Sequence, residues 1–115
     1  MENSTAGPAL DREVALARVG GDPELLKEIA VLFLDNYNAW LGELREAAQR
    51  GDAVGVEHTA HGLKGSVANF GAHAAVDAAL RLETLGRSRD LTDVSRSLTA
   101  LESALTVLRS ELESL

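Results

Sequence analysis

The chain has 115 residues, of which 45% are hydrophobic, and this length allows one core to close without disulfides or a metal ion. It contains no cysteine, which excludes thiol catalysis and favours a reducing compartment, so we expect a cytoplasmic protein. Acidic residues outnumber basic ones by 18 to 11, and the net charge of -7 disfavours nucleic acid as a partner. No apolar run approaches the roughly 20 residues that cross a bilayer, so we expect no membrane insertion.

The composition favours helices throughout, because only 3% of the residues are aromatic and alanine and leucine dominate. We expect residues 1–8 to form a flexible tail and residues 9–115 to form a single helical domain. The first helix is predicted to be short, from about Asp11 to Val19. It ends before Gly20, since glycine readily adopts the positive φ that terminates a helix.

The second predicted helix has the clearest start. Asp22 is a good N-cap, and Pro23 occupies the first helical position, where its missing N–H costs nothing. The helix is predicted to run to about Arg50. Its apolar residues recur at spacings of three and four and form one stripe: Leu26, Ile29, Phe33, Tyr37, Trp40, Leu44 and Ala47.

Three further helices are predicted, over residues 53–70, 72–87 and from 94 to the end, with Asp52 as a cap and Gly71 as a hinge. Their short connections imply antiparallel neighbours. The predicted fold class is therefore all-α, an antiparallel up-and-down four-helix bundle with an additional short N-terminal helix. We attribute the leucine stripe of the last helix to core packing rather than to a dimeric coiled coil, and we expect a monomer.

The third helix has two distinct faces. At about 100° per residue, His61 lies roughly 140° from the centre of the core stripe, Gly65 about 180° and Lys64 about 80°. We therefore expect His61 at the surface and Lys64 at the boundary of the core. The core stripe itself consists of Val56, Ala60, Leu63, Val67 and Phe70.

Small residues flank His61 where a solvated helix would usually carry long polar side chains. They are Gly62, Gly65 and Ala68. Each glycine inside a helix costs about 0.5 to 1 kcal/mol relative to alanine. Two glycines beside one exposed histidine predict that another molecule approaches closely, although close packing inside the protein is an alternative reason for them.

A family resemblance follows from these residues. The run Ala-His-Gly-Leu-Lys-Gly-Ser at 60–66, followed by Asn-Phe-Gly-Ala at 69–72, resembles the signature of histidine-containing phosphotransfer (HPt) domains. The similarity continues with Leu-Glu at 82–83 and Gly-Arg at 86–87 and covers nearly all of the chain from Asp22 onward. Val67 stands where the family commonly has another small residue. Because this position is on the core stripe, we expect the difference to affect packing more than chemistry.

The resemblance implies that His61 accepts a phosphoryl group from the aspartyl phosphate of a receiver domain or from a hybrid sensor histidine kinase. His61 then relays the group to the receiver domain of a response regulator. Lys64 would offset the charge of the phosphoryl oxygens, and Gly65 would allow the partner to approach. Glu83 would hydrogen-bond the other ring nitrogen and fix the tautomer of the ring.

The partner is expected to contact the residues around the histidine: Glu57, His58, Gly62, Gly65, Ala68 and Arg87. Two simpler interpretations remain open. Glu83 and Arg87 are spaced i, i+4 and could form an ordinary surface ion pair worth about 0.3 to 0.5 kcal/mol. Lys64 could be a solvated lysine at the edge of the core.

The sequence lacks a glycine-rich nucleotide loop and a clear acidic cluster for magnesium, so autonomous kinase activity is not expected. The chain is predicted to be a phosphocarrier that binds no metal and no cofactor itself. The Mg²⁺ needed for transfer is expected on the receiver partner.

Two other functions are compatible with the sequence. His58 and His61, spaced i, i+3 with Glu57 adjoining, could contribute to a surface metal site, although they are few ligands. The chain could also be an interaction module that docks a receiver without carrying phosphate. Against that function, the chain retains His61, Lys64 and Gly65 together.

Overall fold

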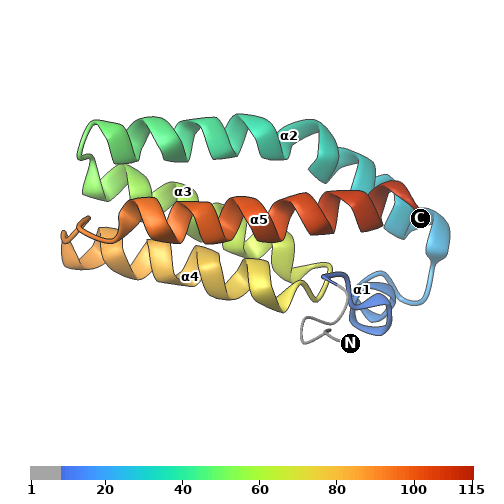
Figure 1. The fold of residues 1–115 in the computed structure, drawn as a ribbon. Helices are drawn as coiled ribbons and strands as arrows, with labels where there is room; N and C mark the ends of the chain where they lie inside the picture. The colour runs from blue at the N-terminus through green and yellow to red at the C-terminus, as the bar shows by residue number, and fades with distance from the viewer. Residues whose placement is uncertain (1–8) are drawn as a thin grey trace, which may run out of the picture.

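The computed structural model describes residues 9–115, and this part of the chain forms five helices (Figure 1). The predicted flexible tail, residues 1–8, lies outside the described residues. The third helix ends at Ala68 rather than near Phe70, and the other boundaries lie close to those predicted. The helices are α1 (Arg12–Arg18), α2 (Pro23–Gln49), α3 (Ala53–Ala68), α4 (His73–Ser88) and α5 (Val94–Glu113).

The four longer helices run alternately up and down and form a bundle, whereas α1 packs beside the beginning of α2 at one end (Figure 1). The predicted all-α bundle with an additional N-terminal helix is therefore confirmed. Within residues 9–115, none of the helices is both long and apolar enough to span a bilayer.

Aspartate side chains cap the N-termini of three helices, α1, α2 and α3. The side chain of Asp22 accepts hydrogen bonds from the backbone N–H groups of Glu24 and Leu25, at 3.0 and 3.2 Å, and Pro23 follows it as predicted. Asp52 accepts from the N–H of Gly55 at 2.9 Å, and this bond lowers the pKa of the aspartate. The Asp52 cap fixes the start of α3.

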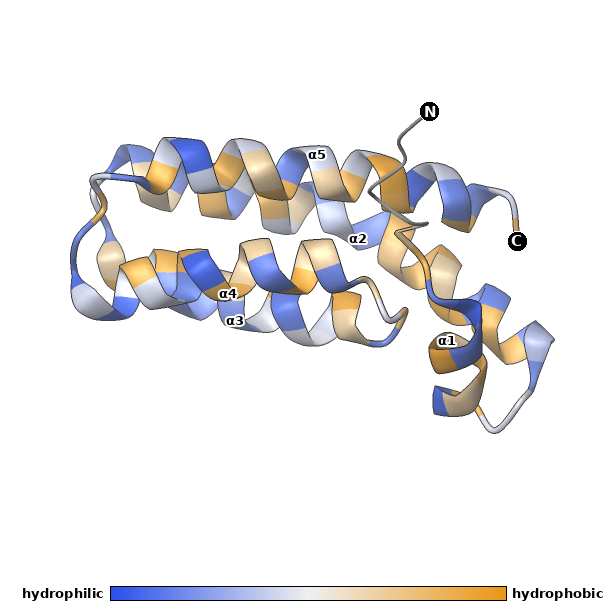
Figure 2. Cartoon of the chain, turned by 60° about the horizontal axis from the view of Figure 1, so that its bottom comes forward, coloured by the Kyte–Doolittle hydropathy of each residue, from blue (hydrophilic) through white to orange (hydrophobic). Residues whose placement is uncertain are grey.

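Apolar and polar residues alternate along the four long helices (Figure 2), and most of the buried residues recur at the helical spacing predicted from the sequence. On α2, Ile29 and Trp40 are only partly buried, whereas Ala30 and Leu41 are buried beside the predicted stripe. Burying a large apolar side chain contributes about 1.5 to 3 kcal/mol. The predicted core stripe of α3 is buried throughout: Val56, Ala60, Leu63, Val67 and Phe70 are each at most 1% exposed.

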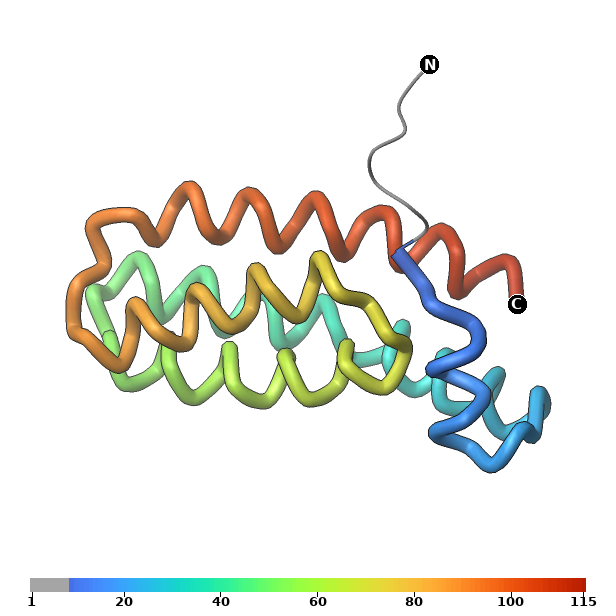
Figure 3. The backbone as a smooth tube through the Cα atoms, turned by 90° about the horizontal axis from the view of Figure 1, so that it is seen from below, coloured from blue at the N-terminus to red at the C-terminus, as the bar shows by residue number. Residues whose placement is uncertain are grey.

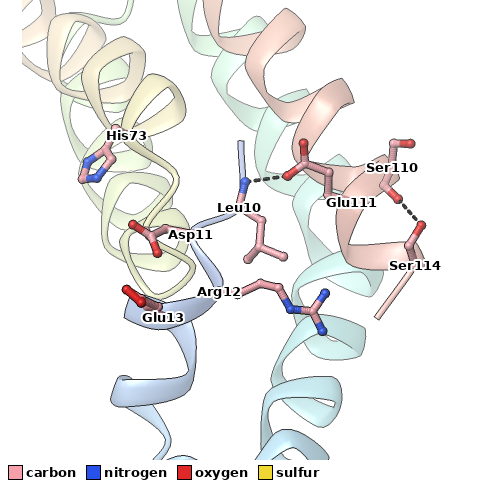
Figure 4. Close-up of a pocket in the computed structure, with 9 residues that line it drawn as sticks. Leu10, Asp11, Arg12, Glu13, His73, Ser110, Glu111 and Ser114 are labelled. Carbon is pink, nitrogen blue, oxygen red and sulfur yellow. Dashed lines mark hydrogen bonds between the residues drawn. The ribbon is translucent and has the colours of Figure 1, made fainter. Parts of the chain in front are cut away.

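The segment before α1 is held to two distant parts of the chain. The backbone N–H of Asp11 donates to the carbonyl of Phe70 at 2.9 Å, next to Gly71, whose φ is +61°. The N–H groups of Ala9 and Leu10 donate to the carboxylate of Glu111 on α5, at 3.0 and 2.6 Å, and Figure 4 shows the bond from Leu10. These bonds join the start of the domain to the α3–α4 turn and to α5.

α3 and α4 lie side by side along the bundle (Figure 3). The two helices approach each other closely at Gly86 of α4. A Cβ atom at this position would lie 2.6 Å from both the carbonyl oxygen of Ala53 and the backbone nitrogen of Glu57. Any side chain at Gly86 would therefore push the two helices apart.

We predict that Gly86→Ala lowers the free energy of unfolding by about 1 to 3 kcal/mol, because the added methyl group meets the backbone of α3. The control is Gly62→Ala, where a Cβ atom would meet nothing within 4 Å. This control should raise the stability by about 0.5 to 1 kcal/mol through helix propensity. Urea unfolding measures both changes, and equal effects at the two positions would contradict the packing role of Gly86.

Candidate functional site

His61 stands on the outer face of α3, and its side chain is 68% exposed, as the helical projection predicts. Its backbone is held in place because Ala60 and Leu63, on either side of it in the sequence, are buried in the core. Within residues 9–115, the ring has one polar contact. Its Nδ1 lies 3.0 Å from Oε2 of Glu83 on α4.

Glu83 is a buried carboxylate, since only 4% of its side chain is exposed. The ammonium group of Lys64 lies 2.7 Å from Oε1, as an ion pair whose angles depart from those of a hydrogen bond. Arg87 donates from Nη2 to Oε2 at 2.8 Å. The contact with Lys64 lowers the pKa of Glu83, burial opposes this effect, and the contact with His61 adds to it.

The ionised state of Glu83 determines which tautomer His61 adopts. A carboxylate can only accept hydrogen bonds, so the proton between the two groups belongs to Nδ1 of the ring. In the neutral imidazole the other nitrogen, Nε2, then carries the free lone pair. The exposed ring therefore presents a nucleophilic nitrogen in a fixed orientation.

Arg87 joins the two helices that carry the site. In addition to its bond with Glu83, it donates from Nε to Oε2 of Glu57 on α3 at 3.1 Å, and this contact raises the pKa of the guanidinium. The interpretation of Glu83 and Arg87 as an ordinary surface pair is wrong, because Glu83 is buried. Lys64 is likewise no freely solvated lysine, since its side chain is 27% exposed and its ammonium is paired with Glu83.

The two glycines beside the histidine have no packing role in the described chain. A Cβ atom at Gly62 or Gly65 would meet nothing within 4 Å. Close packing inside the protein therefore explains Gly86 but not Gly62 or Gly65, which have open space around them. Ala68, the last residue of α3, is half-buried.

One hollow lies beside His61, and a second one shares only His58 with it. The first, of about 350 Å³, is lined by Val54, Glu57, His58, His61, Glu83 and Arg87. The second, of about 240 Å³, is lined by Trp40, Glu43, His58, Thr59, Gly62 and Leu63. A larger hollow of about 630 Å³ lies where the start of α1 meets the end of α5, and none of its lining residues belongs to the cluster around His61 (Figure 4).

The structure thus brings together five residues that were predicted for the site or its surroundings: His61, Lys64, Glu83, Arg87 and Glu57. The contact between Glu57 and Arg87 was not predicted from the sequence. Glu57 precedes His61 by one helical turn and so lies on the same side of α3. Which residue of α4 it faces depends on the register of the two helices, and a single sequence does not reveal that register.

Across residues 9–115, no group of three or more histidine, aspartate or glutamate side chains is arranged to hold a metal ion. The alternative metal site at His58 and His61 therefore has no ligand set in this part of the chain.

The family model described as the Hpt domain matches residues 28–111, which include every member of this cluster. The chain belongs to the Hpt domain family. Its structure is similar to the crystal structure of histidine-containing phosphotransfer protein B (HptB) from Pseudomonas aeruginosa PAO1, with a TM-score of 0.87 and 25% identity over 95% of each chain. No curated protein matched the sequence. Membership of the Hpt family assigns the chain to histidine phosphotransfer in phosphorelays, where Hpt domains interact with receiver domains and kinases.

The buried carboxylate of this Hpt domain gives its stability a defined dependence on pH. The pKa of Glu83 is lowered in the folded state. The ionised carboxylate therefore makes its full contribution to the free energy of unfolding above the pKa of the unfolded state, about 4.3. The contribution is lost as the pH falls through the lower folded value. We predict that Glu83→Gln reduces stability at pH 7 and that the stability of this variant falls less than that of the wild type upon acidification.

Urea unfolding at several values between about pH 7 and pH 3 measures this difference. Glu24→Gln is the control, because it removes the same charge from a side chain that is 80% exposed. An acid-induced loss of stability as steep in Glu83→Gln as in the wild type would contradict the structural role of the Glu83 carboxylate.

Proposed function

We propose that His61 accepts a phosphoryl group from the aspartyl phosphate of a receiver domain. That receiver domain is phosphorylated by a hybrid sensor histidine kinase. The chain then delivers the group to the receiver domain of a response regulator. It acts as a monomeric phosphocarrier in the cytoplasm, without kinase activity of its own. The observation that carries the proposal is the 68% exposed ring of His61, whose Nδ1 is held 3.0 Å from the buried carboxylate of Glu83.

In the proposed step, Nε2 of His61 forms a bond to phosphorus while the bond between phosphorus and the partner's aspartate oxygen breaks. The electron pair of the broken bond leaves on the aspartate carboxylate. The proton on Nδ1 stays in its hydrogen bond to Glu83, which offsets the positive charge that develops on the ring. Mg²⁺ on the receiver partner would neutralise the phosphoryl oxygens.

Lys64 is proposed to assist from the side of the ring. Its ammonium lies 2.7 Å from Glu83, and its side chain remains 27% exposed next to His61. A cation in this position can share its charge between the buried carboxylate and the arriving phosphoryl group.

Clearance around the ring supports docking of a whole domain. Gly62 and Gly65 leave open space beside His61, so a receiver can bring its phosphorus in line with Nε2. We propose that His58 and Ala68 lie at the edges of the same contact surface. Neither residue is a buried core residue, and His58 lines the hollow that His61 also lines.

The decisive experiment is to incubate the protein with phosphorylated receiver domains and to look for acid-labile, alkali-stable label on this chain. We expect label on the wild type and none on His61→Gln. His73→Gln is the matched control, because His73 is also exposed but lies at the start of α4, and it should retain the label. Label on His61→Gln would contradict the assignment. Binding of a receiver to the wild type without any label would indicate an interaction module.

The open space at Gly65 can be tested separately. Gly65→Gln should slow transfer at least about 10-fold, equivalent to roughly 1.4 kcal/mol in the activation barrier, because the new side chain obstructs the approach of the receiver. The fold should persist, since a Cβ atom at Gly65 meets nothing within 4 Å. Gly42→Gln on α2 places the same side chain in similarly open space and should leave the rate unchanged. An unaltered rate in Gly65→Gln would remove the clearance argument.

A further inference from the structure

Arg87 and His61 bind to the same oxygen atom of Glu83. Nη2 of Arg87 lies 2.8 Å from Oε2, and Nδ1 of His61 lies 3.0 Å from it. The other oxygen, Oε1, faces Lys64 at 2.7 Å. The hydrogen bond that orients His61 therefore ends on an oxygen whose negative charge is already partly neutralised by a guanidinium group.

The position of Arg87 is fixed from a second side. Its Nε donates to Glu57 at 3.1 Å, one helical turn before His61 on α3. A guanidinium group presents several N–H donors in one plane and can bind two carboxylates at once, which a single ammonium group does less well. Glu57 thus holds Arg87 against Glu83 although the arginine side chain itself is 61% exposed.

The formal charges around His61 are balanced while its ring is neutral. Glu57 and Glu83 contribute two negative charges, and Lys64 and Arg87 contribute two positive ones. His58 lines the same hollow as His61, and Glu43 of α2 lines the hollow on the far side of His58. Without Arg87, Glu83 would retain a single cationic partner and attract a second proton to the ring more strongly.

We propose that Arg87 is a positioning residue that acts through Glu83. By occupying Oε2, it limits the attraction of this carboxylate for a proton on His61 and so maintains the neutral ring whose Nε2 can attack phosphorus. The proposal rests on the proposed function of His61. It differs from the sequence-based expectation that Arg87 contacts the partner, because here the arginine acts within the chain.

The test begins with the unphosphorylated protein and needs no partner. The titration of the His61 ring is followed by NMR in the wild type, in Arg87→Gln and in the control Arg45→Gln. Arg45 forms a comparable exposed ion pair, 2.7 Å from Glu102 and outside the cluster around His61. We expect the midpoint of Arg87→Gln to move upward by about half a pH unit to one unit, a 3- to 10-fold change in proton affinity. A midpoint equal to or below that of the wild type would overturn the proposal.

A double-mutant cycle tests whether the effect passes through Glu83. In a Glu83→Gln background, Arg87→Gln should shift the midpoint by less than half as much as it does in the wild type. A shift of full size in that background would show that Arg87 acts on the ring directly and would overturn the proposed route. Arg87→Lys retains the charge, so its midpoint should lie between those of Arg87→Gln and the wild type.

The rate of phosphotransfer completes the test. We expect Arg87→Gln to shift the acidic limb of the pH–rate profile to higher pH, while the rate at high pH stays close to that of the wild type. Equal slowing at every pH would instead assign Arg87 to partner docking and contradict the proposal. Failure of the wild type to accept label on His61 would refute the proposed function, whereas the ring titration would still report the coupling between Arg87 and Glu83.

Discussion

The site depends on one buried carboxylate. Burying an ionised glutamate is costly unless cations and hydrogen-bond donors surround it, and Glu83 has Lys64, Arg87 and His61 as its partners. The same contacts that compensate the burial also orient the imidazole of His61. The close approach of α3 and α4 at Gly86 brings Glu83 near the ring. Packing and chemistry are therefore coupled in this part of the bundle.

The remainder of the bundle packs against α3 and α4 and so holds the site in place. A buried stripe on α3 fixes the opposite face of that helix toward solvent, where a partner domain can reach it. A phosphocarrier requires an exposed nucleophile, clear space around it and a defined tautomer. The exposed ring, the open space at Gly62 and Gly65, and the contact with Glu83 meet these three requirements. The metal ion and the acyl phosphate are proposed to come with the partner.

Features that depend on one helix were predictable from the sequence, because local periodicity and capping determine them. The helix starts at Asp22 and Asp52 and the exposure of His61 are of this kind. Features that depend on two helices were not. The sequence does not distinguish a glycine in open space, such as Gly65, from one that admits a neighbouring backbone, such as Gly86. The register of α3 against α4 was unknown for the same reason, and with it the burial of the Glu83 carboxylate and the contact between Glu57 and Arg87.

The central claim is that Glu83 holds the proton on Nδ1 and leaves Nε2 of His61 to take the phosphoryl group. The most direct measurement is NMR of the phosphorylated, ¹⁵N-labelled chain, in which phosphorus–nitrogen coupling identifies the substituted ring nitrogen. We expect phosphorus on Nε2 of His61, with the proton on Nδ1 retained in its bond to Glu83. Phosphorus on Nδ1, or on a histidine other than His61, would contradict it.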